Sequence, residues 1–298
     1  MKTHYYPDSW LTAGYFGNPG SASETGRHEG MTYLAEKSAE NLIRIRERKP
    51  LIHNITNFVV MNYTANVLLA MGASPVMAHA ENEVEEMVSF AGALVLNIGT
   101  LTDSWVGAMI KAGKKATSMG TPVILDPVGS GATTLRTNAA KKIISETNVT
   151  VIRGNASEIL SLRHETSRTK GVDSMHTVED AFETATALAT ELETTLAITG
   201  PVDLITDGKR ILKVSNGHPM MARVTGTGCA ATAVIGAFSS VDDDPVSATA
   251  TALSFFGLAG EKAGRSASAP GSFMIALLDA LYTISPEELK NGCRISRD

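Results

Sequence analysis

The stretch ALVLNIGTLTDSWVGAMIKAGKKATSMGTPVILDP (93–127) decides the fold. It opens with an apolar run at 93–99. A helical pattern follows from about Asp103, its expected N-cap, to Met119, and a second apolar run covers 122–127. Apolar runs of this length are typical of strands that are buried on both faces. A strand–helix–strand unit of this kind forms a right-handed crossover between parallel strands. The stretch therefore predicts an α/β fold.

The same alternation of strands and helices extends in both directions from this stretch. Further strands are predicted at 50–54, 74–78, 149–154 and 195–200, and further helices at 34–48, 57–71, 83–90, 135–146, 178–192, 228–238, 245–263 and 272–282. Asp207-Gly208 joins two short strands, 203–207 and 210–214, and favours a type I′ hairpin turn. We therefore predict a central, mostly parallel sheet that is flanked by helices on both faces and carries a small antiparallel edge hairpin.

The first 30 residues differ in composition from the rest of the chain. They are rich in Gly, Ser, Tyr and Pro and show no helical or strand period. We expect residues 1–30 to be a flexible N-terminal extension and residues 31–298 to form a single domain. Met31 would be a sensible alternative start. The alternative is that the extension is an ordered arm that packs on a partner subunit.

Composition limits the classes of partner. The chain has 298 residues and a formal net charge of −5, and no basic run stands out, which argues against nucleic acid or an acidic membrane surface. No apolar run reaches the roughly 20 residues that span a membrane. Its two cysteines, Cys229 and Cys293, are far apart and lack zinc-ligand spacing. We expect a cytoplasmic protein without disulfides that acts on a small molecule.

Polar residues or glycines follow several predicted strands at the point where each strand ends. These positions include Asn57, Asn97, Asp126, Arg153 and Thr199. The carboxyl ends of parallel strands meet at one edge of a sheet, which is where open α/β sheets bind ligands. Taken alone, each residue is better explained as an ordinary loop residue. The set as a whole favours one shared cleft.

The strongest local motif is VTGTGCAATAVIGAF (224–238). Gly226 and Gly228 let the backbone turn tightly, and a helix of small residues follows. The free N–H groups at its start, from Gly226, Thr227, Gly228 and Cys229, would form an anion hole. A plain loop-to-helix junction is the alternative.

Two common nucleotide motifs do not fit this chain. Gly226, Gly228 and Ala231 match a relaxed dinucleotide fingerprint, but they come late in the chain, and no acid ends a strand about 20 residues further on. A nicotinamide oxidoreductase is therefore disfavoured. No GxxxxGK[ST] sequence occurs, so the chain is not a P-loop NTPase.

Three charged residues at the predicted cleft suit phosphate chemistry. Asp126 and Glu158 are candidates for holding Mg²⁺, since one or two carboxylates near phosphates suffice for this ion. Arg153 could donate two hydrogen bonds to phosphate oxygens. The alternatives are helix-capping or salt-bridged acids and a surface arginine.

Six segments resemble the motifs of hydroxyethylthiazole kinases, in order and with typical spacing. They are HNITNFVVMNYTANVLLAMGASPVMA (53–78), GALVLNIGTL (92–101), PVILDPVGSGAT (122–133), IRGNASEI (152–159), AITGPVD (197–203) and VTGTGC (224–229). Several long motifs in register are far more specific than a lone glycine pattern. The resemblance runs from about residue 33 to 284.

This resemblance implies a ribokinase-like fold and ATP-dependent phosphorylation of the hydroxyl of 4-methyl-5-(2-hydroxyethyl)thiazole in thiamine salvage. It also implies Mg²⁺ and a homotrimer with active sites at the subunit interfaces. By motif position, it assigns ATP contacts to Arg153 and Thr199, thiazole contacts to Met77 and Gly226 with Asn57 close by, and action through Mg²⁺ to Asp126 and Glu158. The alternatives are another ribokinase-like activity, such as a pyrimidine or pyridoxal kinase or a repair dehydratase, and a catalytically dead sensor.

Cys229 occupies the place where most ribokinase-like kinases carry an aspartate base. A helix N-terminus lowers the pKa of a thiol, so we expect a lowered pKa at Cys229, whose thiolate could take the alcohol proton. The alternative is a small residue that fits a tight turn.

Overall fold

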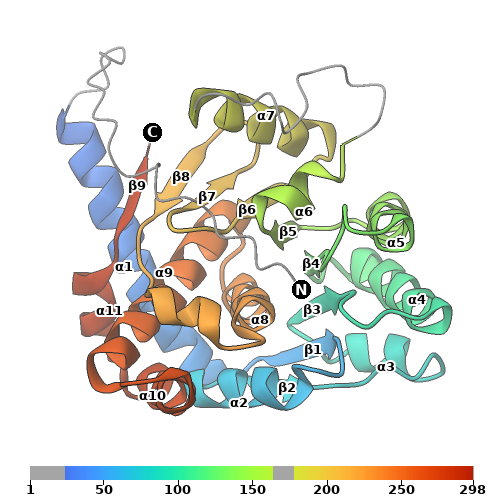
Figure 1. The fold of residues 1–298 in the computed structure, drawn as a ribbon, viewed down its shortest axis with the longest axis horizontal. Helices are drawn as coiled ribbons and strands as arrows, with labels where there is room; N and C mark the ends of the chain where they lie inside the picture. Colours follow the sequence, from blue (N-terminus) through green and yellow to red (C-terminus); the bar gives the residue numbers. More distant parts are fainter. Residues whose placement is uncertain (1–23, 164–177, 298) are drawn as a thin grey trace.

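A nine-stranded sheet forms the middle layer of the computed structural model, which describes residues 24–163 and 178–297 (Figure 1). The strand order is β2-β1-β3-β4-β5-β6-β7-β8-β9. The strands are β1 (Leu51–Ile55), β2 (Ser74–Val76), β3 (Ala93–Asn97), β4 (Val123–Asp126), β5 (Val151–Gly154), β6 (Thr195–Ile198), β7 (Asp203–Thr206), β8 (Ile211–Val214) and β9 (Ile295–Arg297). Pairing is parallel from β2 to β6 and antiparallel from β6 to β9. The predicted parallel sheet with an antiparallel edge is confirmed.

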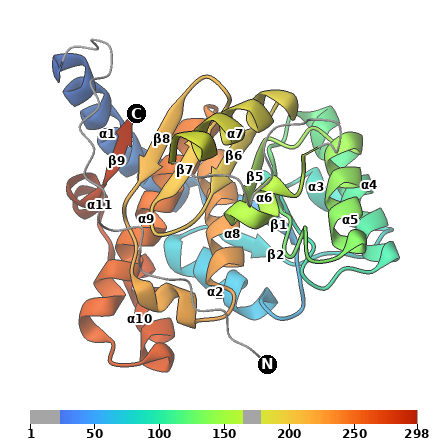
Figure 2. The ribbon, with the colours of Figure 1, turned by 45° about the horizontal axis from the view of Figure 1, so that its top comes forward.

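Helices cover both faces of the sheet (Figures 1 and 2). One face carries α1 (Glu24–Arg48), α2 (Met61–Met71), α8 (Thr227–Ser239), α9 (Pro245–Ser266), α10 (Pro270–Thr283) and α11 (Pro286–Gly292). The other carries α3 (Val84–Val88), α4 (Asp103–Met119), α5 (Thr134–Glu146), α6 (Ala156–Leu160) and α7 (Val178–Glu191). A 3₁₀ helix, η2 (Pro219–Arg223), precedes α8. None of the described helices is long and apolar enough to cross a membrane.

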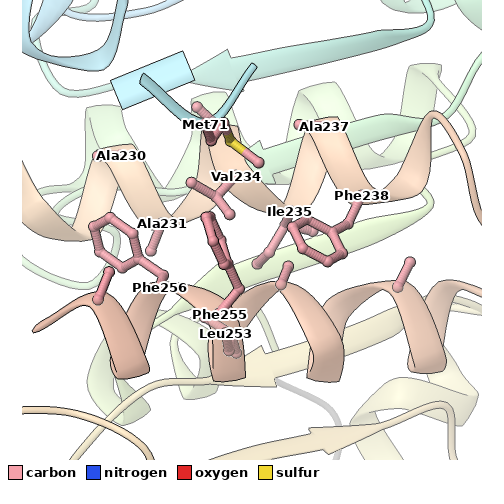
Figure 3. Packing of buried hydrophobic residues seen from close by; sticks show 14 of the residues in the cluster. Met71, Ala230, Ala231, Val234, Ile235, Ala237, Phe238, Leu253, Phe255 and Phe256 are labelled. Atoms are coloured by element: carbon pink, nitrogen blue, oxygen red, sulfur yellow. The ribbon is translucent and has the colours of Figure 1, made fainter. Parts of the chain in front are cut away.

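Helix α8 lies between the sheet and α9, and its small residues allow both contacts. A Cβ atom on Gly236 would come within 2.8 Å of Val95 Cγ2 in β3, so the helix approaches the sheet too closely for a larger residue. On the other side, the rings of Phe238 and Phe255 in α9 pack with their centroids 5.8 Å apart (Figure 3). This packing fixes the direction of α8, whose first turn lies at the carboxyl ends of the parallel strands.

The starts of α1 and α2 and the N-cap of α4 differ from the prediction. Helix α1 begins at Glu24 rather than at residue 34, so residues 24–30 of the expected extension belong to it, while residues 1–23 lie outside the described residues. Helix α2 begins at Met61 rather than at Asn57, because the Asn57 side chain accepts a hydrogen bond from the Val59 N–H at 3.1 Å and shapes a turn. The N-cap of α4 is Thr102, not Asp103.

The antiparallel edge also departs from prediction. Four residues join β7 to β8, and Asp207 Oδ1 accepts hydrogen bonds from the N–H groups of Lys209 and Arg210. Of these four residues only Gly208 has a positive φ, whereas a type I′ turn needs two. Helix α11 and strand β9 were missed, and β9 completes the edge beside β8 (Figure 1).

Candidate active site

The strand order reverses between β1 and β3, at the carboxyl ends of the parallel strands. The connection from β1 to β2 runs through α2 on one face, and the connection from β2 to β3 runs through α3 on the other. Such a reversal opens a crevice where α/β sheets bind ligands. Asn57 follows β1 and donates from Nδ2 to Asn97 Oδ1, at the end of β3, at 2.8 Å.

A chain of hydrogen bonds continues from Asn97 to Asp126. Asn97 Nδ2 donates to Asp126 Oδ2 at 2.8 Å, and Thr232 Oγ1 in α8 donates to the same oxygen at 3.0 Å. Arg153 Nη1 lies 3.8 Å from this oxygen. The structure thus brings together side chains from β3, β4, β5 and α8.

The second oxygen of Asp126 has no hydrogen-bond partner among the described residues. Asp126 is 1% exposed, and its Oδ1 atom is buried and unpaired. Burial raises the pKa of Asp126 to about 6, against the opposing charge of Arg153, and the nearby Glu158 carboxylate raises it further. A buried carboxylate oxygen without a donor is placed to accept a cation.

Glu158 caps a helix as well as facing Asp126. Its Oε2 accepts from the Asn155 N–H at 2.9 Å and its Oε1 from the Gly129 N–H at 2.9 Å. Asn155 Oδ1 accepts from the Glu158 N–H, which completes a capping box at the start of α6. The capping role that was the alternative for Glu158 is therefore present, and it ties the loop after β4 to the loop after β5.

The two carboxylates fit Mg²⁺. The donor set is oxygen only, Asp126 offers an unpaired oxygen, and the Glu158 oxygens each keep a lone pair beyond the bond they accept. Magnesium binds through one or two carboxylates and keeps several waters. No group of three or more His, Cys, Asp or Glu residues that could hold a metal occurs in the described part of the chain, so protein ligands alone would not enclose the ion.

Arg153 and Thr199 line a cavity of about 570 Å³. Arg153 Nη2 donates to Thr199 Oγ1 at 2.7 Å, so the two predicted phosphate-side residues are in contact. The rest of the lining comes from the turn after β6, the segment 216–222, the first turns of α8, and α9. Its apolar wall includes Met221, Leu253 and Phe256.

The start of α8 closes the cavity beside Arg153. Gly226 has a φ of +87°, which glycine adopts readily, and a Cβ atom there would come within 2.8 Å of Val60 Cγ1. Thr227 and Gly228 line the cavity. In an α-helix the first N–H groups have no intrahelical acceptor, so Gly228 and Cys229 present donors at this end. The Thr227 N–H, which was also predicted for the anion hole, donates instead to the Val224 carbonyl oxygen at 3.5 Å. The motif therefore has the geometry of an anion site.

Cys229 does not have the lowered thiol pKa that the sequence predicted. Its Sγ accepts a weak hydrogen bond from Asn57 Nδ2 at 3.6 Å. Burial, and next the charge of Asp126, raise the pKa of the Cys229 thiol to about 11. Desolvation of the thiolate outweighs the helix N-terminus, so Cys229 is a thiol at neutral pH.

The predicted residues thus form two joined groups. Arg153, Thr199, Thr227 and Gly228 line the cavity, while Asn57, Asp126 and Cys229 belong to the hydrogen-bonded chain beside it. Arg153 contacts both. Met77 lies apart from the cavity lining, half-buried directly after β2.

Sequence reasoning missed four polar residues of this region. These are Asp203, Asn216 and His218 in the cavity lining and Thr232 on Asp126. Burial raises the pKa of Asp203 to about 6. Thr232 had a usable signal, since it lies three positions after Cys229, a spacing that puts both on one helix face. Asp203 also had one, because it ends the segment AITGPVD (197–203), whereas Asn216 and His218 lie in a segment with no motif of its own.

Comparison with known proteins gives a consistent result. Residues 42–287 match the Hydroxyethylthiazole kinase family. A hydroxyethylthiazole kinase of Desulfotalea psychrophila is 68% identical over 265 residues, which are 89% of this chain and 97% of that protein. One of Pyrococcus furiosus is 52% identical over 252 residues, 84% of this chain and 94% of that protein.

Solved structures agree. The hydroxyethylthiazole kinase protein of Pyrococcus horikoshii superposes with a TM-score of 0.80 at 47% identity, covering 88% of this chain and 98% of that one. A ribokinase-like superfamily protein of Enterococcus faecalis has a TM-score of 0.61 at 12% identity, over 86% of this chain and 95% of that chain, which shows the fold alone.

Proposed function

The chain belongs to the hydroxyethylthiazole kinase family, and we propose that the cavity beside Arg153 holds ATP while the crevice around Asn57 holds the thiazole. Its reaction is the phosphorylation of the hydroxyl of 4-methyl-5-(2-hydroxyethyl)thiazole in thiamine biosynthesis and salvage. One observation carries the assignment of the two sites. Arg153 donates to Thr199 at the cavity and lies 3.8 Å from Asp126 at the crevice, so its guanidinium stands where the two meet.

Phosphoryl transfer asks the protein mainly to position groups and to neutralise charge. Arg153 and the N–H groups of Gly228 and Cys229 converge at the start of α8. They would stabilise the phosphoryl oxygens as negative charge is redistributed during transfer. Thr199 fixes the guanidinium by accepting its Nη2 hydrogen bond.

Asp126 and Glu158 would hold Mg²⁺ through its waters or directly. The ion, when bound, neutralises phosphate charge. Asn97 and Thr232 both donate to Asp126 Oδ2, which leaves Oδ1 free for this role. The Glu158 hydrogen bonds to Gly129 and Asn155 keep its carboxylate in place.

Cys229 acts in this proposal as a protonated thiol. A thiol with a pKa of about 11 holds its proton at neutral pH, so it cannot serve as a strong base in the free enzyme. A loose transition state leaves the alcohol proton on oxygen until late, which makes a strong base unnecessary. The contact of Cys229 with Asn57 at 3.6 Å supports a position on the proposed substrate side.

The substrate side would be formed by Met77, Gly226 and Asn57. Next to Asn57, Phe58 and Val59 are 61% and 67% exposed, although both are large and apolar. Such side chains beside a site favour burial by another surface. They support a homotrimer in which each interface covers an active site.

We assign the activity to a single kinase domain at residues 31–298, and the cytoplasm as its location, since both described cysteines are free. A pyrimidine or pyridoxal kinase and a dead sensor are the less favoured alternatives. A coupled ADP-release assay across thiazole, hydroxymethylpyrimidine and pyridoxal alcohols tests the proposal. Preferred turnover of a pyrimidine or pyridoxal substrate, or of none, would refute it.

A further inference from the structure

The segment after β2 is attached to β1 by a buried histidine. His53 in β1 is 0% exposed, and its Nε2 lies 2.7 Å from the carbonyl oxygen of Ala78. Burial lowers the pKa of His53, so the ring is neutral and Nε2–H donates to that oxygen. Ala78 directly follows Met77. The backbone is therefore fixed one residue after the proposed thiazole contact.

A second contact holds the same segment from the side. The rings of His79 and Trp105 are stacked, with centroids 4.3 Å apart and an interplanar angle of 2°. Trp105 lies in the first turn of α4 and is 8% exposed, whereas His79 is exposed. The nearly buried indole of Trp105 thus covers one face of the exposed His79 ring.

The stack reaches the loop that carries Asn57. The ring of Phe58 meets Trp105 edge-on, with centroids 4.6 Å apart at 78°. The Phe58 N–H also donates to Thr100 Oγ1 at 3.1 Å. One indole therefore joins the loops after β1 and β2 to the start of α4, all at the same end of the sheet.

We propose that the His79–Trp105 stack, with the His53 contact as its support, positions Met77 and thereby sets affinity for the thiazole rather than for ATP. The inference rests on the proposed function, because it takes Met77 as a substrate contact. A methionine side chain is flexible, and its place depends on how firmly its backbone is held. None of His53, His79 and Trp105 lines the cavity assigned to ATP, so the two affinities should respond separately.

His79 allows a clean test, since it is exposed and its replacement leaves the core intact. His79→Ala removes the stack, and His79→Tyr keeps an aromatic ring. Phe90→Ala is the matched control, because Phe90 is 68% exposed and lies before β3, at the opposite end of the sheet. KM for thiazole and for ATP would be measured for all three variants and for Met77→Ala. Amide hydrogen exchange of the peptide 74–83 would be followed alongside.

We expect His79→Ala to raise KM for thiazole by about 2- to 12-fold, the range for losing one aromatic pair, with KM for ATP unchanged. Exchange in 74–83 should quicken. His79→Tyr should restore the parent values of KM for thiazole and of exchange in 74–83, and Phe90→Ala should change neither of these two quantities. Met77→Ala should raise KM for thiazole.

The inference would be overturned if His79→Ala and Phe90→Ala had equal KM values for thiazole, or if His79→Ala raised KM for thiazole and KM for ATP in parallel. Unchanged hydrogen exchange in 74–83, or an unchanged KM for thiazole in Met77→Ala, would also overturn it. Absence of thiazole turnover by the wild-type chain would count against the proposed function instead. The exchange measurement would still decide whether the stack holds the segment.

Discussion

Arg153 and Gly228 are in such close contact that a side chain at residue 228 would collide with the guanidinium of Arg153. A Cβ atom there would come within 2.8 Å of Arg153 Nη1 and 3.1 Å of Nη2. The φ of Gly228 is not positive, so the backbone itself does not require glycine. A larger residue at position 228 would have to displace the Arg153 guanidinium, which extends from β5 and lies against the first turn of α8.

Gly228→Ala should therefore displace Arg153 while leaving the fold intact. We expect kcat/KM for ATP to fall by about 10- to 100-fold, as for small misplacements of a catalytic group. Helix stability should rise slightly, since alanine is favoured over glycine in helices by about 1 kcal/mol. Gly107→Ala in α4 is the control, because nothing lies within 4 Å of its Cβ position. Steady-state kinetics and thermal unfolding of both variants check this, and unchanged ATP kinetics in Gly228→Ala would contradict it.

Arg153→Ala removes the guanidinium altogether. We expect a loss of roughly 2–4 kcal/mol in kcat/KM for ATP, as for removing a contact to transition-state charge. Arg153→Lys should lose less, because it keeps the charge without the two-pronged donor. Arg44→Ala serves as the control and should keep parent kinetics, because Arg44 on α1 does not line the cavity and donates to the Val241 carbonyl oxygen instead. Parent kinetics in Arg153→Ala would mean that the arginine plays no part in catalysis.

Cys229→Ala should retain kcat within about tenfold of the parent, because a thiol with a pKa of about 11 is not a base at neutral pH. Cys229→Asp should be slower, since it adds a second carboxylate beside Asp126 and near the phosphates. Single-turnover rates measure both. A nearly inactive Ala variant beside an active Asp variant would restore the base hypothesis.

Asp126→Asn tests the buried carboxylate in the absence of ATP and Mg²⁺. The pKa of Asp126 in the folded protein is about 6, above the ordinary value of 3.8. Above pH 6 the ionised carboxylate therefore lowers the free energy of unfolding. This destabilisation disappears as the pH falls below 3.8, where the carboxyl is protonated in both the folded and the unfolded protein. At pH 7 the variant should be more stable than the parent by up to about 3 kcal/mol, and the difference should shrink toward pH 4. Urea unfolding between pH 4 and 8 measures it. Asp279→Asn, which makes the same replacement at an exposed position on α10, is the matched control. If the difference in unfolding free energy between Asp126→Asn and the parent did not change with pH, the raised pKa of Asp126 would be refuted.

Assembly is the last prediction. Light scattering during gel filtration should report a trimer, and Phe58→Ser should weaken it, because Phe58 is a large exposed apolar residue beside the site.

Deleting residues 1–23 should leave activity and assembly intact, since the family match begins at residue 42. A fully active monomer would contradict the interfacial site, and loss of assembly on deletion would favour the ordered-arm alternative.

The sequence by itself determined the order of most strands and helices and the sheet edge at which the candidate site lies. Buried strands such as 93–97 and 123–126 are continuous apolar runs, and that signal is local to each segment. Because parallel strands share a direction, Asp126 and Arg153 had to end at one edge. The six segments that resemble hydroxyethylthiazole kinase motifs also identified the family. Strand β9 escaped detection because its three residues are specified by pairing with β8 rather than by a pattern of their own.

Tertiary structure alone decided the electrostatic character of the site. The sequence placed Cys229 at a helix N-terminus and predicted a lowered pKa, but packing buried its thiol beside Asp126 and raised the pKa instead. The same burial left Asp126 Oδ1 unpaired and raised the pKa of Asp126. The cost of removing a charge from water depends on every atom that surrounds it. Those atoms come from strands and helices far apart in the chain, so no local pattern of residues encodes that cost.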